Sequence, residues 1–364
     1  MDPLDPRHKA VPQNFVSAYP LDTSSARSSF GYPIAAFKVV SREDGLLYCI
    51  RRVDNVRSVS HKIAMAVTER WATATVVHSG ANVLDHPGVV KFYRCFLANR
   101  AVFFLHHYIP GARTLRERFF NPNAGGSVAL PEPLVWSCIT QIVSAIRAVH
   151  GANLACRTLQ LNHVLCTAAP DGTGRIRLRI NCLAVVDALE FEARKQLQDL
   201  QKEDMRDLGR IIMSLATGTE IARTSDANSI RRCDVFVAQN YSRALHNLVV
   251  QLLLPTSNPP SIYEVCTIIA SRAFDEIDVQ QSAIDSTEYA LAAEYDSGRA
   301  LRLLLKMGFV NERPELGMNR RWTESGDCYV LKLFRDYGRP FVNAFVVVVV
   351  VVVVVVGLQQ LGSV

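Results

Sequence analysis

The order of the expected secondary-structure elements restricts the fold of this chain more than any single motif does. Before Gly111, runs of β-branched and aromatic residues such as FGYPIAAFKVV and LLYCIRRV alternate with turns, and a single helical stretch lies near residues 59–75. After Gly111, the segment LPEPLVWSCITQIVSAIRAVHGANL places Trp136, Ile139 and Val143 on one helical face, and two more helical segments follow. A small strand-rich lobe followed by a larger helical lobe predicts an α+β fold.

Composition narrows the class of protein. The 364 residues suggest two or three structural units, and a net charge of +6 permits nucleic-acid binding without indicating it. A hydrophobic content of 49% with 20% charged residues excludes a disordered acidic tail, a collagen-like chain and a membrane bundle. The nine cysteines include no C-x-x-C pair, as expected of buried thiols in a reducing compartment, and the first residues lack an apolar signal. A cytoplasmic protein is expected.

The last third of the chain combines a helical pattern with an abnormal segment. Ile277, Ile284 and Leu291 recur every seven residues, which fits a coiled coil that Gly298 interrupts, or an ordinary amphipathic helix. Val346–Val356 is an unbroken run of valine, too short to span a membrane and typical of an aggregating strand. The run favours an error in the reading frame or assembly over a natural segment.

Three phrases resemble a protein kinase in their order and spacing. They are DHPGVVKFYRCF, QIVSAIRAVH and DMRDLG, which resemble the phrase that leads into strands four and five, the helix before the catalytic loop, and the start of the central large-lobe helix. The resemblance implies a two-lobed kinase fold.

The residues that a kinase needs for phosphoryl transfer are replaced. The glycine-rich loop reads FGYPIAAF, and Arg51 stands where a kinase has its strand lysine. The catalytic loop reads Cys156-Arg157-Thr158 and ends at His163, and the metal-holding D-F-G reads Asn181-Cys182-Leu183. These losses predict a pseudokinase that is not an enzyme. Glu69 is placed either to pair with Arg51 or, more simply, on a solvated helix surface. The alternative of a divergent active kinase would need Asp187 or Asp204 as the replacement carboxylate.

Further segments are similar to one family, the regulatory pseudokinase subunits of the PAN poly(A)-nuclease deadenylase complex. The segments YCIRR, HYIPGARTLRERF, GANLACRT, RLRINCL, NERPEL and GDCYVLKLFRDY carry this resemblance over about residues 30–337. It implies a disordered leader (1–29), a pseudokinase domain (30–272), a coiled coil (273–310) and a C-terminal knob (311–364) that the valine run at 346–356 disrupts. Nothing comparable to NERPEL or VLKLFRDY occurs in a generic kinase.

The resemblance implies a regulatory, non-catalytic scaffold that binds ATP without hydrolysing it. Binding of magnesium together with ATP is compatible with this resemblance. Such a scaffold forms a homodimer and, through its coiled coil and knob, recruits or activates the catalytic nuclease for shortening of mRNA poly(A) tails. Its contact with mRNA is indirect, and no membrane is involved. The alternative is a pseudokinase scaffold whose nucleotide site is empty. The residues carried over to the nucleotide site are Arg51, His107, Tyr108, Ile109, Pro110, Gly111, Ala112, Arg113, Thr114, Asn162 and His163, with no catalytic residue and no metal ligand.

The sequence departs from this family in two places. The leader has neither a Cys/His ligand set for a zinc finger nor the asparagine- and proline-rich peptide that binds the poly(A)-binding protein, so recruitment through that protein is doubtful in this chain. The knob is altered beyond Arg339, which puts docking of the nuclease in doubt. Trp322 and Tyr329 in the knob are placed either to bind a partner or, more simply, to pack in the knob's core.

Overall fold

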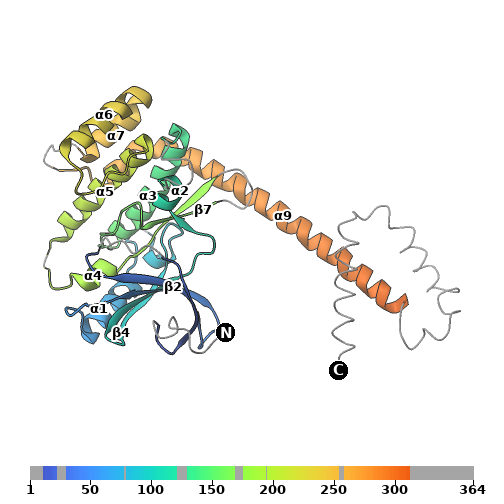
Figure 1. Cartoon of the computed structure of the whole chain (residues 1–364). Helices are drawn as coiled ribbons and strands as arrows, with labels where there is room; N and C mark the ends of the chain where they lie inside the picture. The colour runs from blue at the N-terminus through green and yellow to red at the C-terminus, as the bar shows by residue number, and fades with distance from the viewer. Residues whose placement is uncertain are drawn as a thin grey trace. The chain divides into compact units, whose positions relative to one another are not determined.

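The computed structural model describes residues 11–22, 30–77, 79–120, 129–168, 175–193, 195–253 and 258–311. It divides into two compact units, Met1–Val279 and Gln280–Val364. The first unit contains two lobes. Its strand-rich lobe and α1 lie at one end, and α5, α6 and α7 lie at the other (Figure 1).

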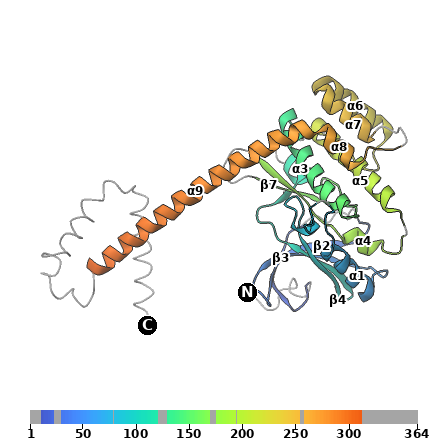
Figure 2. The same ribbon diagram turned by 180° about the vertical axis from the view of Figure 1, so that it is seen from behind.

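The first lobe is a five-stranded antiparallel sheet in the order β1-β2-β3-β5-β4. The strands are β1 (Phe15–Pro20), β2 (Ile34–Ser41), β3 (Leu47–Val53), β4 (Phe92–Ala98) and β5 (Ala101–His107). Helix α1 (His61–Ala72) begins where the Ser60 hydroxyl accepts a hydrogen bond from the Ile63 amide at 3.3 Å. It buries Ala64, Val67 and Trp71 and packs against β4 (Figure 2).

Strand β1 corrects the expectation of a disordered leader over residues 1–29. Phe15 and Val16 pair with β2, and Val11 and Phe15 are buried in the cluster that covers the outer face of the sheet. The alternation of side chains in β1 is broken by a register shift between Val16 and Tyr19, where Ser17 has φ 55°. Such an irregularity interrupts the two-residue period, so the sequence lacks the alternation that predicts a strand. The prediction was therefore wrong for the described residues 11–20.

The second lobe is mainly helical, as its sequence pattern predicts. Helix α3 (Glu132–Gly151) buries most of its length, and α5 (Leu197–Thr217) packs against it. A three-stranded sheet lies in the order β6-β7-β8. The remaining elements are η2 (Val83–Asp85), β6 (Arg113–Thr114), α2 (Leu115–Phe119), β7 (Val164–Ala168), β8 (Ile176–Ile180), α4 (Val185–Leu189), α6 (Ala227–Asn240), α7 (Arg243–Leu253) and α8 (Ile262–Ile268).

Helix α9 comprises Ala270–Asn311, of which the residues up to Val279 belong to the first unit and the others to the second. In the first unit, the Ser137 hydroxyl donates to Glu276 at 2.8 Å and Arg175 donates to the Val279 carbonyl at 2.9 Å. In the second unit the helix continues through Gly298, which confirms the predicted long helix. Pairing of this helix as a coiled coil remains a prediction, as do the proposed domain limits at 272 and 310.

The C-terminal knob with Trp322, Tyr329 and the valine run lies outside the described residues. Among the helices that the structure does describe, none is both long and apolar enough to cross a membrane.

Candidate functional site

The polar residues of the candidate site lie on one face of the first-lobe sheet. This face is opposite to the one that is covered by the hydrophobic cluster with Val11 and Phe15. Directly paired residues in neighbouring strands share a face, and the register pairs Lys38 with Cys49, Ala36 with Arg51, and Cys49 with His106. The intervening residues, Ile50 among them, belong to the apolar cluster on the other side. The pleat therefore places Arg51 and His106 on one face.

Arg51 and His106 each carry a buried polar atom that has no hydrogen-bond partner among the described residues. These atoms are Nη1 of Arg51, a donor, and Nδ1 of His106, an acceptor when Nε2 donates to the Leu183 carbonyl at 3.3 Å. An unsatisfied buried polar group costs free energy, so both atoms mark a place where a ligand would be stabilising. Glu69 is exposed on α1 and forms no ion pair with Arg51, as expected of a solvated surface residue.

His163 and Cys182 complete what we call the Arg51 cluster: Arg51, His106, His163 and Cys182. Burial, helped by the charge of Arg51, lowers the pKa of both His106 and His163 to about 3, so both rings are neutral at pH 7. Burial also raises the pKa of Cys182 to about 11 against the opposing influence of Arg51. The guanidinium of Arg51 is therefore the one charged group of this cluster near neutral pH.

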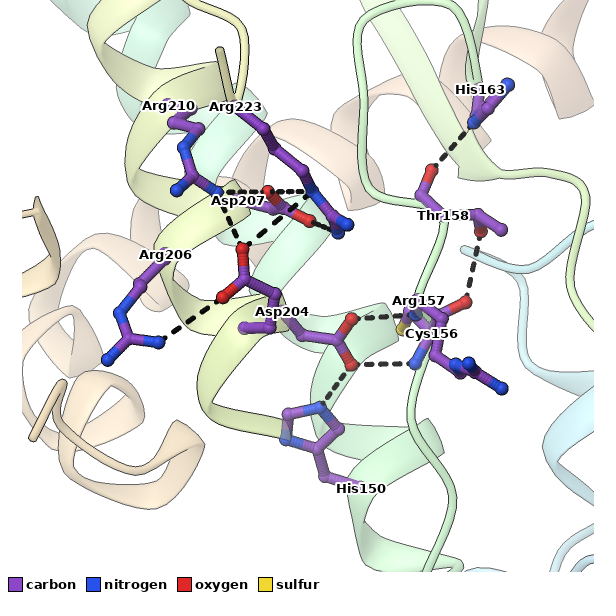
Figure 3. Close-up of polar contacts among 11 residues, drawn as sticks. His150, Cys156, Arg157, Thr158, His163, Asp204, Arg206, Asp207, Arg210 and Arg223 are labelled. Carbon is purple, nitrogen blue, oxygen red and sulfur yellow. Dashed lines mark hydrogen bonds and ion pairs between the residues drawn. The ribbon is translucent and has the colours of Figure 1, made fainter. Parts of the chain in front are cut away.

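The loop that corresponds to a kinase catalytic loop is closed on itself by hydrogen bonds. Nδ1 of His163 lies 3.1 Å from the Thr158 carbonyl (Figure 3). The Thr158 hydroxyl donates to the Asn181 carbonyl at 3.2 Å. Phe30 covers the His163 ring, with the ring centroids 4.7 Å apart and nearly parallel. His163 was predicted as a site residue from the kinase-like loop. Phe30 was not predicted, because no local pattern links a residue before β2 to this loop.

Residues 107–114 connect the two lobes, as expected of a kinase hinge. The Tyr108 ring lies 5.1 Å from Nζ of Lys38, so this part borders the face that carries Arg51. Ile109, Pro110, Gly111 and Ala112 form the turn, in which Gly111 has φ 66°. Their contact with a nucleotide remains a prediction.

Three of the predicted site residues have other environments. Arg113 and Thr114 form β6, and the Thr114 hydroxyl caps α2 by accepting from the Glu117 amide at 3.1 Å. Asn162 is exposed next to the buried His163. The structure thus groups Arg51 with His163 and adds His106, whose inward position follows from its register with Cys49.

Asp204 binds the backbone of this loop through hydrogen bonds and cannot serve as a replacement catalytic carboxylate. It is fully buried and accepts hydrogen bonds from the amides of Cys156 and Arg157, both at 2.7 Å, and from Nε2 of His150 at 2.9 Å (Figure 3). One helical turn further, Asp207 accepts from Arg210 and Arg223. These carboxylates are structural, which removes the support for an active kinase that uses Asp204.

Asp187 is occupied in a similar way. Its two oxygens accept from the indole N–H of Trp71 at 2.8 Å and from Nη1 of Arg157 at 2.9 Å, and Arg157 also binds Glu190 at 2.5 Å. We call Trp71, Asp187 and Arg157 the Asp187 bridge. It connects α1 of the first lobe to α4 and the loop of the second.

Asp187→Asn is expected to lower the free energy of unfolding by about 1–3 kcal/mol, because a buried charge-assisted hydrogen bond with Arg157 is lost while size is kept. Thermal and urea unfolding measure this. The matched control is Glu190→Gln, which removes the more exposed carboxylate bound to Arg157 and is expected to cost less than about 1 kcal/mol. Equal effects of the two variants would contradict the importance of the bridge.

The two lobes, with arginine at the strand-lysine position and no carboxylate at the D-F-G position, define a pseudokinase. The chain resembles the solved pseudokinase of Neurospora crassa PAN3 (TM-score 0.74, 28% identity, 90% of this chain and 77% of that chain) and that of Drosophila melanogaster PAN3 (TM-score 0.76, 29% identity, 90% and 83%). The chain belongs to the family of PAN3 subunits of PAN2-PAN3 deadenylation complexes. The predicted family, fold class and pseudokinase character are confirmed.

Curated relatives and a family model support the same assignment. The chain is 35% identical to the Dictyostelium discoideum PAN2-PAN3 deadenylation complex subunit pan3 and 33% identical to the human subunit, over 99% and 85% of its own length. It spans 48% and 36% of the length of these two relatives. The family model described as the Pan3 C-terminal knob domain matches residues 262–357, a range that includes the valine run.

Proposed function

We propose that this chain is a regulatory, non-catalytic scaffold of a cytoplasmic deadenylation complex that binds ATP and recruits or activates the catalytic nuclease for poly(A)-tail shortening. The observation that carries nucleotide binding is the buried guanidinium of Arg51, whose Nη1 has no partner in the described part of the chain. A phosphate group is a suitable partner for it because an arginine fork binds phosphate with two charge-assisted hydrogen bonds.

Titration calorimetry of the full chain with ATP, supported by a thermal-shift assay, tests this proposal. Saturable heat and a rise in the melting temperature are expected, since a ligand that binds only the folded state stabilises it. A folded sample that gives neither response would contradict nucleotide binding.

The second candidate is a scaffold whose nucleotide site is empty. The stacking of Phe30 on His163 favours it, because this aromatic ring covers part of the loop that faces the nucleotide in a kinase. Phe30→Ala separates the two candidates. If the empty-site scaffold is correct and Phe30 blocks the site, the variant gains ATP binding that the native chain lacks.

The nuclease partner is proposed from a relative. A solved complex joins the WD40-CS1 part of Neurospora crassa PAN2 with the pseudokinase and C-terminal region of PAN3, to which this chain is similar with a TM-score of 0.76 over 90% of its length. Co-purification with the cognate PAN2-type nuclease and a poly(A)-shortening assay test recruitment. A nuclease that neither binds the chain nor changes in rate would contradict it.

If the chain forms a homodimer through α9, a charged residue in the exposed apolar stripe of this helix is expected to abolish the dimer. Ile277, Ile284 and Leu291 are 48%, 55% and 64% exposed, so a second helix could cover them. Ile284→Arg is expected to leave a single chain of 40.4 kDa by light scattering, whereas the native protein is expected to have twice this mass. Ser282→Arg is the control: it lies five positions after Ile277 and two before Ile284, outside the apolar stripe, and should stay dimeric. A native monomer would contradict the coiled coil.

A further inference from the structure

We infer that the nucleotide site holds its ligand without a divalent cation, and that Arg51 provides the positive charge that magnesium provides in a kinase. This inference rests on the proposed nucleotide binding. It concerns the two positions from which a kinase holds its metal ions, the aspartate of D-F-G and the last residue of the catalytic loop. Here they are Asn181 and His163.

The side chain of Asn181 is a poor replacement for a metal-binding carboxylate. It is neutral and buried, and its Oδ1 already accepts a hydrogen bond from the Cys182 amide at 2.8 Å. Its carbonyl accepts from the Thr158 hydroxyl at 3.2 Å, and its amide donates to the His163 carbonyl at 2.8 Å. Asn181 is thus held by Cys182 and by Thr158 and His163 of the neighbouring loop rather than directed at a ligand.

His163 is unsuitable for the second position. Magnesium is a hard cation that takes oxygen ligands in near-octahedral geometry, and an imidazole offers only nitrogen. One ring nitrogen of His163 lies 3.1 Å from the Thr158 carbonyl, and Phe30 is stacked on the ring. A cation beside this ring would also meet the like charge of Arg51, which acts on both His163 and His106.

The nearby carboxylates do not compensate for these losses. Asp187 is bound by Trp71 and Arg157, and Asp204 accepts three hydrogen bonds from the loop and α3. Asp22, after β1, is the carboxylate whose charge acts on Arg51. One carboxylate beside an arginine is a weak magnesium site, because the arginine already neutralises it. The donor set therefore does not fit magnesium, whereas the unpartnered Nη1 of Arg51 fits a phosphate oxygen.

Calorimetric titration of the full chain with ATP, in magnesium and separately in excess EDTA, tests this inference. The expected dissociation constants agree within about threefold, a difference of less than 1 kcal/mol. Binding that is at least about a hundredfold weaker in EDTA would overturn the inference and leave the proposed function intact. Absence of binding in both conditions would overturn both.

A variant with the kinase ligands restored provides the matched control. His163→Asn with Asn181→Asp returns an amide and a carboxylate to the two positions, so magnesium is expected to strengthen ATP binding by about tenfold or more. Circular dichroism and the melting temperature establish that the variant is folded, and Asn181→Asp alone serves as a second variant if it is not. Asp22→Asn in the native background should leave the affinity for ATP in EDTA undiminished. If the native chain binds ATP more tightly with magnesium than in EDTA and Asp22→Asn removes this difference, Asp22 is a metal ligand and the inference is wrong.

Discussion

Arg51→Ala is expected to weaken ATP binding by roughly a hundredfold to ten-thousandfold. The guanidinium can form two charge-assisted hydrogen bonds with a phosphate, each contributing about 1.5–3 kcal/mol, and alanine removes both. No other charged group of the Arg51 cluster can substitute, because His106 and His163 are neutral at pH 7. Titration calorimetry with ATP measures the loss.

Arg52→Ala is the matched control for this prediction. Arg52 is the next residue of β3, so it points to the opposite face of the sheet, where its Nε binds Asp54 at 2.8 Å. Removal of this neighbouring arginine should change the dissociation constant less than about threefold. If Arg51→Ala binds ATP as the native chain does, the ligand site lies elsewhere or does not exist. Arg51→Lys should bind with intermediate affinity because it keeps the charge and loses the fork.

Asp204→Asn is expected to lower the free energy of unfolding by about 3–5 kcal/mol, the largest stability effect that the structure predicts. The carboxylate satisfies two backbone amides and one imidazole at full burial, and an amide group in its place must direct its NH2 at one of these donors. The melting temperature of the first unit should fall by on the order of 10 °C.

Asp199→Asn provides the comparison for Asp204 within the same helix. Its side chain is 67% exposed and lies 3.9 Å from Lys202, so its loss should cost less than about 0.5 kcal/mol. Urea unfolding followed by circular dichroism measures both variants. If Asp204→Asn unfolds at the same urea concentration as Asp199→Asn, the loop does not depend on the buried carboxylate.

The features of the fold that depend on local sequence patterns or on the family resemblance were predicted correctly. The two-lobed order, the strand that carries Arg51 and the buried face of α3 follow from periodicity, and the missing carboxylates follow from alignment to kinase motifs. Strand β1 was missed because its bulge removes the alternation that reveals a strand. The long helix α9 was expected from the resemblance, and Gly298 does not break it because one glycine weakens a helix by only about 1 kcal/mol, which the rest of a long helix can offset.

The environment of the candidate site could be predicted only in part. Arg51 and His163 were identified by their positions in kinase-like motifs, and the structure couples them electrostatically. His106 lies near them because of the register between β3 and β5, and Phe30 because it contacts His163, which is 133 positions away in the sequence. Neither relation can be predicted from a short segment of sequence. Thr114 was included in the site although its hydroxyl is used by the helix that it caps.

The Asp187 bridge has a consequence for how ATP could act on a scaffold of this kind. Trp71 and Arg157 bind the same carboxylate from two lobes, so a change of shape in response to ATP would first have to break these bonds. A ligand that binds a chain whose lobes are already joined acts by mass action. It increases the fraction of folded molecules as the ligand concentration rises above the dissociation constant. The abundance of the scaffold, rather than its conformation, would then follow the energy charge of the cell.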